Sequence, residues 1–170
     1  MKPALLHPAR ALPSTGHIGR AATLALYDEL SLTPKPGLVT LVDRGSHDDM
    51  DAHSFMRSLF ALRSYFPKMA QAGSQGASFP VLERLGIEAE QRMLAATGGI
   101  NTHRGAVFML GLLCAAGGAV LAEQACIPGA AWLREALCRH WGEALQHRSL
   151  RAASLRPARE IGRASCKERV

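Results

Sequence analysis

Hydrophobic residues recur at helical spacing in five segments of this chain. The clearest is 81–96, whose apolar residues lie three or four positions apart: Val81, Leu82, Leu85, Ala89, Met93 and Ala96. Similar spacing predicts amphipathic helices over about 14–32, 48–65 and 133–145. Residues 106–122 carry no charged side chain, which predicts a helix that is buried on all sides.

The breaks between these segments fall at proline and glycine. Pro34 and Pro36 fix φ and remove two hydrogen-bond donors, so they predict a stiff turn that presents Lys35. Pro67 is expected to end or kink the second helix, and residues 73–78 to form a flexible connector. β-branched residues are sparse and no alternating pattern persists, so we predict an all-α fold, a helical bundle of about five helices.

The length of 170 residues suits one domain with a sizeable core. We expect an all-α nucleotide-binding domain over 14–147, a mobile lead-in over 1–13 and a basic tail over 148–170 that is disordered or non-native. The net charge of +6 reflects that tail, because residues 147–170 carry +5 and residues 1–146 only +1. This distribution argues against nucleic acid as a partner.

The cysteines and the apolar segment bear on the compartment. None of the four cysteines forms a CxxC or metal-binding spacing, which favours free thiols in a reducing cytoplasm. The N-terminal residues lack the continuous apolar core of a signal peptide. Residues 106–122 approach the length of about 20 that a membrane span needs. Their many glycines and alanines favour a central bundle helix, so we predict a cytoplasmic protein without a membrane span.

The stretch Thr97–Gly105 joins two predicted helices and admits two interpretations. In the first, Gly98 and Gly99 take positive φ and end one helix, and Asn101 or Thr102 caps the next. That interpretation leaves two residues unexplained, His103 and Arg104, because cations in the first turn of a helix oppose its dipole. In the second, the glycine turn and the free N–H groups of the helix start bind a phosphate.

All five aspartates of the chain lie between residues 28 and 51. A helix that starts at Asp48 or Asp49 would place Asp48 and Asp51 on one face. Carboxylates at this density repel unless a cation lies among them, and hard oxygen ligands suit Mg²⁺. The alternative is a helix N-terminus enriched in acids for its dipole and cap. With Lys35 and the glycine turn, the acids favour a magnesium–polyphosphate site, although no P-loop is present.

Three blocks of the chain resemble the signature blocks of triphosphoribosyl-dephospho-CoA synthases. The blocks are 31–39, 47–51 and 97–105, and they come in the family's order with similar spacing. The closest resemblance is to the form associated with malonate decarboxylase rather than citrate lyase, and it covers about residues 18–146. It implies an all-α enzyme that converts ATP and 3′-dephospho-CoA into 2′-(5″-triphosphoribosyl)-3′-dephospho-CoA and adenine, for the prosthetic group of an acyl carrier subunit.

The resemblance and the residue types together imply roles for the site. Asp48, Asp49 and Asp51 would bind Mg²⁺ and supply the base for the attacking hydroxyl. Lys35, His103 and Arg104 would hold the triphosphate. The residues expected to shape the turn or orient the ribose are Gly98, Gly99, Asn101 and Thr102. Weaker candidates are Glu29, Asp43, Arg44 and His47.

Two departures from the family qualify these expectations. Residues 40–46 carry extra residues before His47, and family members are longer, with a further glycine-rich motif that is absent here. We therefore expect a C-terminally truncated, incomplete version of a larger all-α domain. A homodimer is compatible with this expectation. Rival interpretations are a magnesium-dependent N-ribosyl hydrolase of the ADP-ribosyl type and an inactive fragment that only associates with a partner protein.

Overall fold

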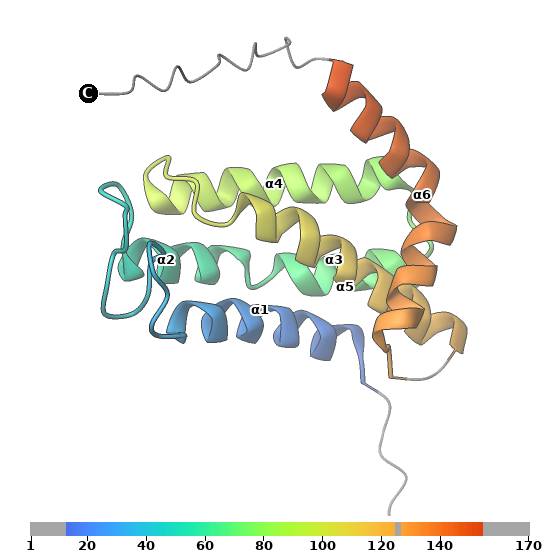
Figure 1. Ribbon diagram of the computed structural model, residues 1–170. Helices are drawn as coiled ribbons and strands as arrows, with labels where there is room; N and C mark the ends of the chain where they lie inside the picture. The colour runs from blue at the N-terminus through green and yellow to red at the C-terminus, as the bar shows by residue number, and fades with distance from the viewer. Residues whose placement is uncertain (1–12, 125–126, 155–170) are drawn as a thin grey trace, which may run out of the picture.

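The described part of the chain is all helical. The computed structural model describes residues 13–124 and 127–154, and no strand occurs within them. The helices are α1 (Thr15–Ser31), α2 (Ala52–Leu62), α3 (Tyr65–Ser74), α4 (Phe79–Thr97), α5 (Arg104–Gln124) and α6 (Ala130–Ser154). In Figure 1, α1, the α2–α3 pair and α4 form three rows, α5 crosses them, and α6 closes one end. The all-α prediction is confirmed. Residues 1–12 of the expected lead-in and 155–170 of the tail lie outside the described residues.

The second predicted helix is two helices, so residues 13–124 and 127–154 contain six helices in place of about five. It starts at Ala52, with Asp51 as its N-cap, rather than at Asp48 or Asp49, and it ends at Leu62. Pro67 does not end it: this proline is the third residue of α3. A proline in the first turn of a helix removes only an N–H that has no partner within the helix. The expected connector is correspondingly shorter, because α3 continues to Ser74.

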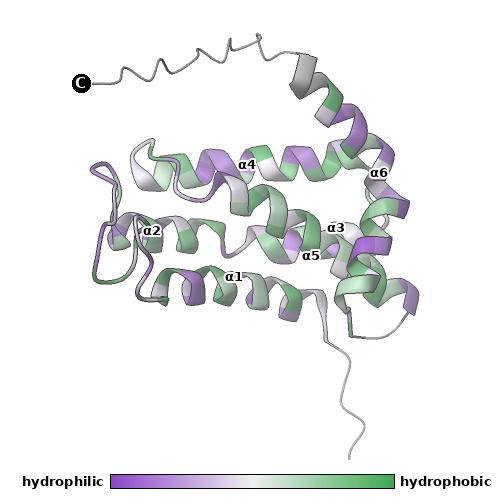
Figure 2. Cartoon of the chain, viewed as in Figure 1, coloured by the Kyte–Doolittle hydropathy of each residue, from purple (hydrophilic) through white to green (hydrophobic). Residues whose placement is uncertain are grey.

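The core lies where α5 passes over α3. Figure 2 shows α5 hydrophobic along most of its length, and its glycines let the two backbones approach closely. A Cβ on Gly118 would collide with the backbone carbonyl of Ala70 on α3. The Tyr65 hydroxyl on α3 donates to the Val107 carbonyl on α5 at 3.0 Å. By length and composition α5 could also cross a membrane, but 56% of that window is buried within the described fold, as in a core helix.

The last helix is anchored along the bundle. Trp141 is buried and its Nε1–H donates to the Ala77 carbonyl at 2.9 Å, which confirms a core position for this tryptophan. α6 continues to Ser154, seven residues past the boundary expected for the domain. Arg148 pairs with Glu83 on α4, and its guanidinium lies 5.4 Å from the Phe108 ring centroid. These contacts hold α6 against the bundle as far as Arg148, the first residue of the basic segment.

Candidate functional site

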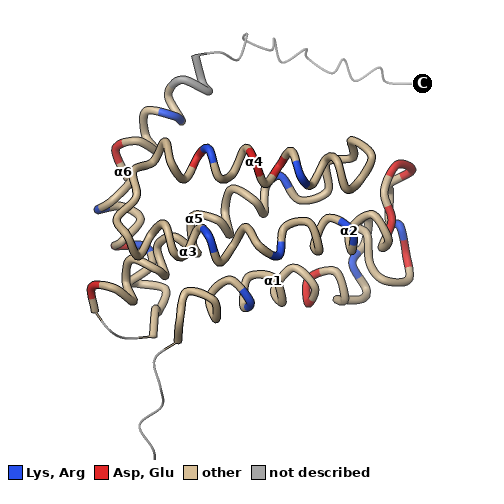
Figure 3. Tube along the Cα trace, turned by 180° about the vertical axis from the view of Figure 1, so that it is seen from behind, with Lys and Arg blue, Asp and Glu red and all other residues tan. Residues whose placement is uncertain are grey.

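Three segments meet at one end of the bundle. They are the loop before α2, the first turns of α2, and the turn between α4 and α5. Both connections lie at the end of the bundle opposite α6 (Figure 1). Several acidic residues lie along the loop before α2 (Figure 3). The structure therefore brings the predicted acidic block and the predicted glycine turn to the same region of the molecule.

The loop before α2 is held by its own hydrogen bonds. The backbone N–H of Thr40 donates to the Asp43 carbonyl at 2.7 Å, and the Thr40 hydroxyl accepts the Asp43 N–H at 2.9 Å. The Asp43 carboxylate accepts the N–H of Gly45 at 3.0 Å. The Ser46 N–H donates back to the Gly37 carbonyl at 3.2 Å, which closes the loop. Asp43 is thus used to shape this loop.

Asp51 is committed to the start of α2. Its Oδ1 accepts the Ser54 N–H at 2.9 Å, and the Ser54 hydroxyl accepts the Asp51 N–H at 2.9 Å in return. Its Oδ2 pairs with Arg44 at 3.3 Å. The hydrogen bond from the Ser54 N–H is the main effect that lowers the pKa of Asp51; it outweighs the opposing effect of desolvation, and the Arg44 guanidinium lowers the pKa further. Because α2 begins after Asp51, the expectation that Asp48 and Asp51 share a helical face is wrong.

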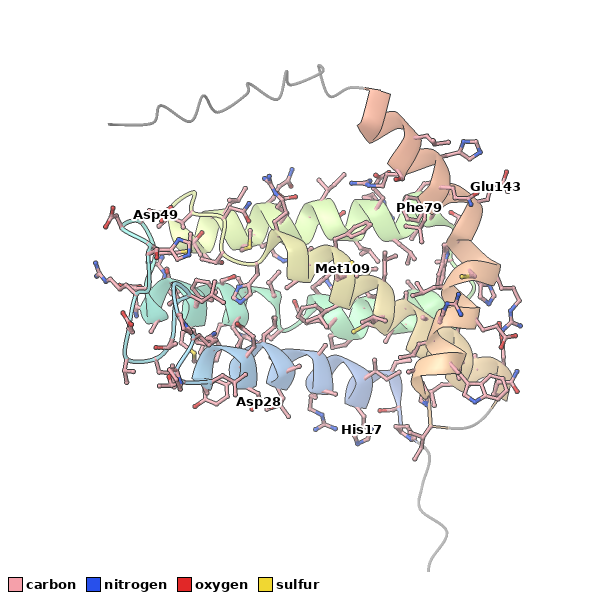
Figure 4. All side chains as sticks on the ribbon, in the orientation of Figure 1. His17, Asp28, Asp49, Phe79, Met109 and Glu143 are labelled. Carbon is pink, nitrogen blue, oxygen red and sulfur yellow. The ribbon has the colours of Figure 1, made fainter. Side chains whose placement is uncertain are left out.

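Asp48 and Asp49 are exposed, and they line a hollow of about 190 Å³. Thr97 at the end of α4 and Ile100 after the two glycines line the same hollow, so the acidic loop meets the residues that flank the glycine turn. Figure 4 shows Asp49 on the loop at this end of the molecule. In the part of the chain that the structure describes, no three His, Cys, Asp or Glu side chains converge as a metal site. The donor set fits Mg²⁺ only if substrate phosphates complete it.

The glycine turn is built as the sequence predicts. Gly98 and Gly99 have φ of 69° and 92°, and the Gly99 N–H caps α4 through the Leu94 carbonyl at 2.8 Å. The Asn101 side chain accepts the Arg104 N–H at 3.1 Å, which confirms the predicted cap of α5. The His103 N–H lies 3.3 Å from the Met93 sulfur, to which it donates. Two N–H groups expected to bind phosphate therefore already donate within the protein.

Two of the three residues expected to hold the triphosphate, Lys35 and Arg104, are paired with acids. Lys35 donates to the Glu29 carboxylate at 2.7 Å and to the Glu29 carbonyl at 2.6 Å, at the C-terminal end of α1. Its side chain is only 12% exposed, so the stiff turn presents it to α1 rather than to solvent. Arg104 pairs with Glu90 on α4 and lines a separate hollow of about 310 Å³ between α4 and α5. Arg104 does not line the hollow of the acidic loop.

His103 is buried and uncharged. It is 6% exposed, and its Nδ1 lies 2.6 Å from the Ser58 hydroxyl on α2. Phe55 packs edge-on against the ring, with centroids 4.8 Å apart. Burial lowers the pKa of His103 to about 4, against a smaller opposing effect of Glu29. At neutral pH His103 is therefore a neutral hydrogen-bonding group, and the expected cationic role is wrong.

A third hollow, of about 330 Å³, lies beside His103. The polar residues that line it are Glu29, His47, Thr102 and His103, and its apolar wall includes Leu26, Val39 and Phe55. Three buried polar atoms have no partner among the described residues, and two of them, His103 Nε2 and Thr102 Oγ1, belong to residues that line this hollow. Buried polar groups are almost always satisfied in folded proteins, so these atoms mark a place where a ligand can bind.

Ser58 and Phe55 are site residues that sequence reasoning missed. Ser58 is fully buried on α2, four residues from both Ser54 and Leu62 on the same buried face. A serine in the middle of an apolar stripe was the one available signal, since such a hydroxyl needs a partner. Its partner is 45 residues away along the chain, which no local pattern shows.

Comparison with known proteins gives one family. A family model described as ATP:dephospho-CoA triphosphoribosyl transferase (CitG) matches residues 15–165. No solved structure matches the chain.

Curated relatives carry names of the same kind. A probable 2-(5''-triphosphoribosyl)-3'-dephosphocoenzyme-A synthase of Vibrio cholerae is 40% identical over 131 residues, 69% of this chain and 42% of the relative. The protein so named in Acinetobacter calcoaceticus is 43% identical over 126 residues, 74% and 43% of the two chains. The synthase of Pectobacterium atrosepticum is 48% identical over 100 residues, 55% and 33%. The chain thus spans less than half of the length of these relatives. Since the family model matches nearly its whole length, this chain belongs to the ATP:dephospho-CoA triphosphoribosyl transferase family.

Proposed function

We propose that this chain transfers the triphosphoribosyl group of ATP to the 2′-hydroxyl of 3′-dephospho-CoA and releases adenine. The observation that carries the proposal is the family match over residues 15–165. Relatives that are 40% to 48% identical and are named as synthases of this product support it. The family match fits this transfer, and it does not fit the alternative of ADP-ribosyl-type hydrolysis.

The reaction exchanges one bond at the anomeric carbon of the ATP ribose. The bond between C1′ and the adenine nitrogen breaks, and the 2′-oxygen of dephospho-CoA forms a new bond to C1′. Adenine leaves with the electron pair of the broken bond and takes up a proton, which balances the proton that the attacking hydroxyl gives up. C1′ gains cationic character on the way, as in glycoside hydrolysis. A carboxylate beside C1′ can stabilise that charge or accept the hydroxyl proton.

Asp48 and Asp49 are the carboxylates best suited to these roles. Both are exposed in the hollow of the acidic loop, whereas the oxygens of Asp51 are engaged by Ser54 and Arg44. Mg²⁺, when bound, supplies positive charge beside the triphosphate and is held by one or two carboxylates plus phosphate oxygens. Two guanidiniums that line the same hollow, those of Arg44 and Arg57, add further positive charge. Glu29 is the second candidate for the base.

Adenine release tests this assignment. The purified chain is incubated with ATP, dephospho-CoA and Mg²⁺, and adenine is measured by chromatography. We expect Asp48→Asn or Asp49→Asn to lower the rate by about 100-fold or more, the range typical of a lost general base. Asp28→Asn is the matched control, because Asp28 is an exposed aspartate on α1 that lies away from the acidic loop (Figure 4). We expect it to leave the rate unchanged.

The same assay separates the rival interpretations. Adenine release without dephospho-CoA would indicate a hydrolase and contradict the transfer. No adenine with both substrates present would indicate a fragment without activity of its own. A rate that is equally low in Asp28→Asn would contradict the assignment of Asp48 and Asp49 while leaving the transfer in place.

We further propose that the product becomes the prosthetic group of the acyl carrier subunit of malonate decarboxylase. The resemblance of residues 31–39, 47–51 and 97–105 to the malonate-associated form supports this destination. A strain without this gene should then contain that subunit without its prosthetic group. Intact-mass measurement of the malonate decarboxylase and citrate lyase carrier subunits tests it, and loss of the group from the citrate lyase subunit alone would contradict it.

A further inference from the structure

The ring nitrogen of His103 that carries the proton can be identified from the hydrogen bond that the other ring nitrogen makes with Ser58. The Ser58 hydroxyl is fully buried, and its hydrogen-bond partner among the described residues is His103 Nδ1, at 2.6 Å. If Nδ1 carried the proton, the serine hydrogen would be buried without an acceptor, which is costly. The serine O–H therefore donates to Nδ1, and the ring proton lies on Nε2. The unpartnered Nε2 is a neutral N–H donor.

The lining of this hollow is wrong for phosphate and right for a nucleoside. Glu29 is the one lining residue that carries a permanent charge, and it is already paired with Lys35. Phosphate sites supply Arg, Lys or several backbone N–H groups. Here the polar groups are a neutral imidazole N–H and a threonine hydroxyl, set among aliphatic side chains and the Phe55 ring. A volume of about 330 Å³ falls in the range of small-molecule pockets, about 300–1,000 Å³.

We propose that this hollow is an adenosine subsite, in which His103 Nε2–H and the Thr102 hydroxyl bind acceptor atoms of the purine–ribose unit. The inference rests on the proposed function, because ATP and dephospho-CoA both contain adenosine. The loop before α2, the first turns of α2 and the segment that follows α4 line both this hollow and that of Asp48 and Asp49, and α1 adds Leu26 and Glu29 to this one. A nucleoside in this hollow would therefore lie at the same end of the bundle as the two aspartates. Ser58 is a positioning residue that fixes the ring and its tautomer.

Two substitutions of His103 distinguish loss of the Nε2–H donor from loss of the imidazole ring itself. In His103→Gln the amide nitrogen can occupy the place of Nε2, so the donor to the hollow is kept. In His103→Asn the shorter amide reaches only the place of Nδ1, so the Ser58 contact is kept and the donor is lost. The purified chain and both variants are titrated calorimetrically with adenosine and, separately, with inorganic tripolyphosphate in the presence of Mg²⁺. Thermal melts verify that each variant is folded.

We expect His103→Asn to weaken adenosine binding by about 3- to 10-fold, the usual effect of one lost hydrogen bond. His103→Gln should stay close to the unsubstituted chain, and tripolyphosphate affinity should not change in either variant. Thr102→Val keeps the shape of threonine without its hydroxyl, and should weaken adenosine by a similar factor, with Thr102→Ser restoring it. This second pair keeps the test decisive if His103→Asn does not fold.

Competition titrations identify the source of the adenosine. ATP and dephospho-CoA each displace adenosine, and the substrate whose affinity falls in His103→Asn is the one that occupies the subsite. The inference is overturned if adenosine does not bind the chain, if the variants weaken tripolyphosphate instead, or if neither substrate loses affinity. Adenosine binding with the expected pattern but no adenine release would contradict the proposed function alone. Adenine release with unchanged adenosine affinity in both His103→Asn and Thr102→Val would contradict this inference alone.

Discussion

His103 shows how one residue's chemistry depends on its partners. Ser58 and Phe55 enclose the ring and desolvate it, so the charged form is disfavoured. The pKa of His103 falls from 6.5 to about 4 in the folded chain. The unfolded chain, with its higher pKa, takes up the proton first as the pH falls. The stabilisation from the neutral ring is complete above pH 6.5 and is lost as the pH falls from 6.5 to about 4.

The pH dependence of unfolding measures this effect. Between pH 7.5 and pH 5, the His103 contribution to the free energy of unfolding should fall by about 2 kcal/mol. His103→Gln has no titrating group there, so its stability should fall by that much less over the same interval. Urea titrations followed by circular dichroism at the two pH values give the comparison. Parallel pH profiles for the two proteins would contradict the burial of a neutral ring.

Residues of the site differ in how far local sequence determines their roles. The positive φ of Gly98 and the Asn101 cap follow from neighbours within three residues, and both were predictable. Lys35, Arg104 and His103 were expected to meet phosphate because their residue types suit it. Their partners, Glu29, Glu90 and Ser58, lie 6, 14 and 45 residues away. Such pairings depend on the packing of helices, which residue type alone does not show.

At the scale of elements, the contact between α3 and α5 depends on small residues. Gly118→Ala should destabilise the fold although alanine favours helices, because its Cβ would collide with the Ala70 carbonyl. We expect a loss of about 1–3 kcal/mol in the free energy of unfolding, typical of overpacking. Gly142→Ala on α6 is the matched control, since its Cβ would meet only the Cys138 Cβ, at 4.0 Å. There alanine should stabilise the helix by up to about 1 kcal/mol.

Urea titrations of the two variants test this contact. Equal effects of the two substitutions, in either direction, would mean that α3 and α5 do not approach as closely as the structure shows.

The helices differ in whether the sequence pattern alone predicts where they begin and end. The extent of α4 follows from the residues at its ends, Pro80 in its first turn and Gly98 at its C-cap. The division between α2 and α3 does not, because Pro67 is compatible with either a helix end or a helix start. The apolar face on each side of Arg63–Ser64 packs against different neighbours, α4 for α2 and chiefly α5 for α3. Tertiary packing decides where that chain turns.

For the whole molecule, the hollow of the acidic loop and the hollow beside His103 lie at the same end of the bundle. The order of the three blocks along the chain gives no distance between them, but the fold brings residues of all three together beside the α4–α5 turn. The acidic loop provides exposed carboxylates there, and the His103 hollow provides neutral donors and an apolar wall. One hollow therefore suits a charged group and the other an uncharged nucleoside, so a molecule that contains both would use the two hollows together.

Thiol labelling reports on the opening of the whole fold. Cys114 is buried in the middle of α5, and burial raises its pKa to about 12, whereas Cys138 on α6 is exposed. A polar thiol reagent should modify Cys138 at the rate of a free thiol. Cys114 should react only when the bundle unfolds, at least about 1,000-fold more slowly if the fold has ordinary stability. Mass spectrometry of the separated peptides gives both rates in one experiment.

Gly118→Ala couples this measurement to the helix contact. Because it loosens the packing of α5 on α3, it should speed Cys114 labelling by about fivefold or more and leave Cys138 unchanged, since 1 kcal/mol of lost stability raises the open population by that factor. Gly142→Ala should slow Cys114 labelling or leave it unchanged. Fast labelling of Cys114 in the unsubstituted chain would mean that α5 is not enclosed by the other helices. The bundle, and both hollows built on its end, would then not persist in solution.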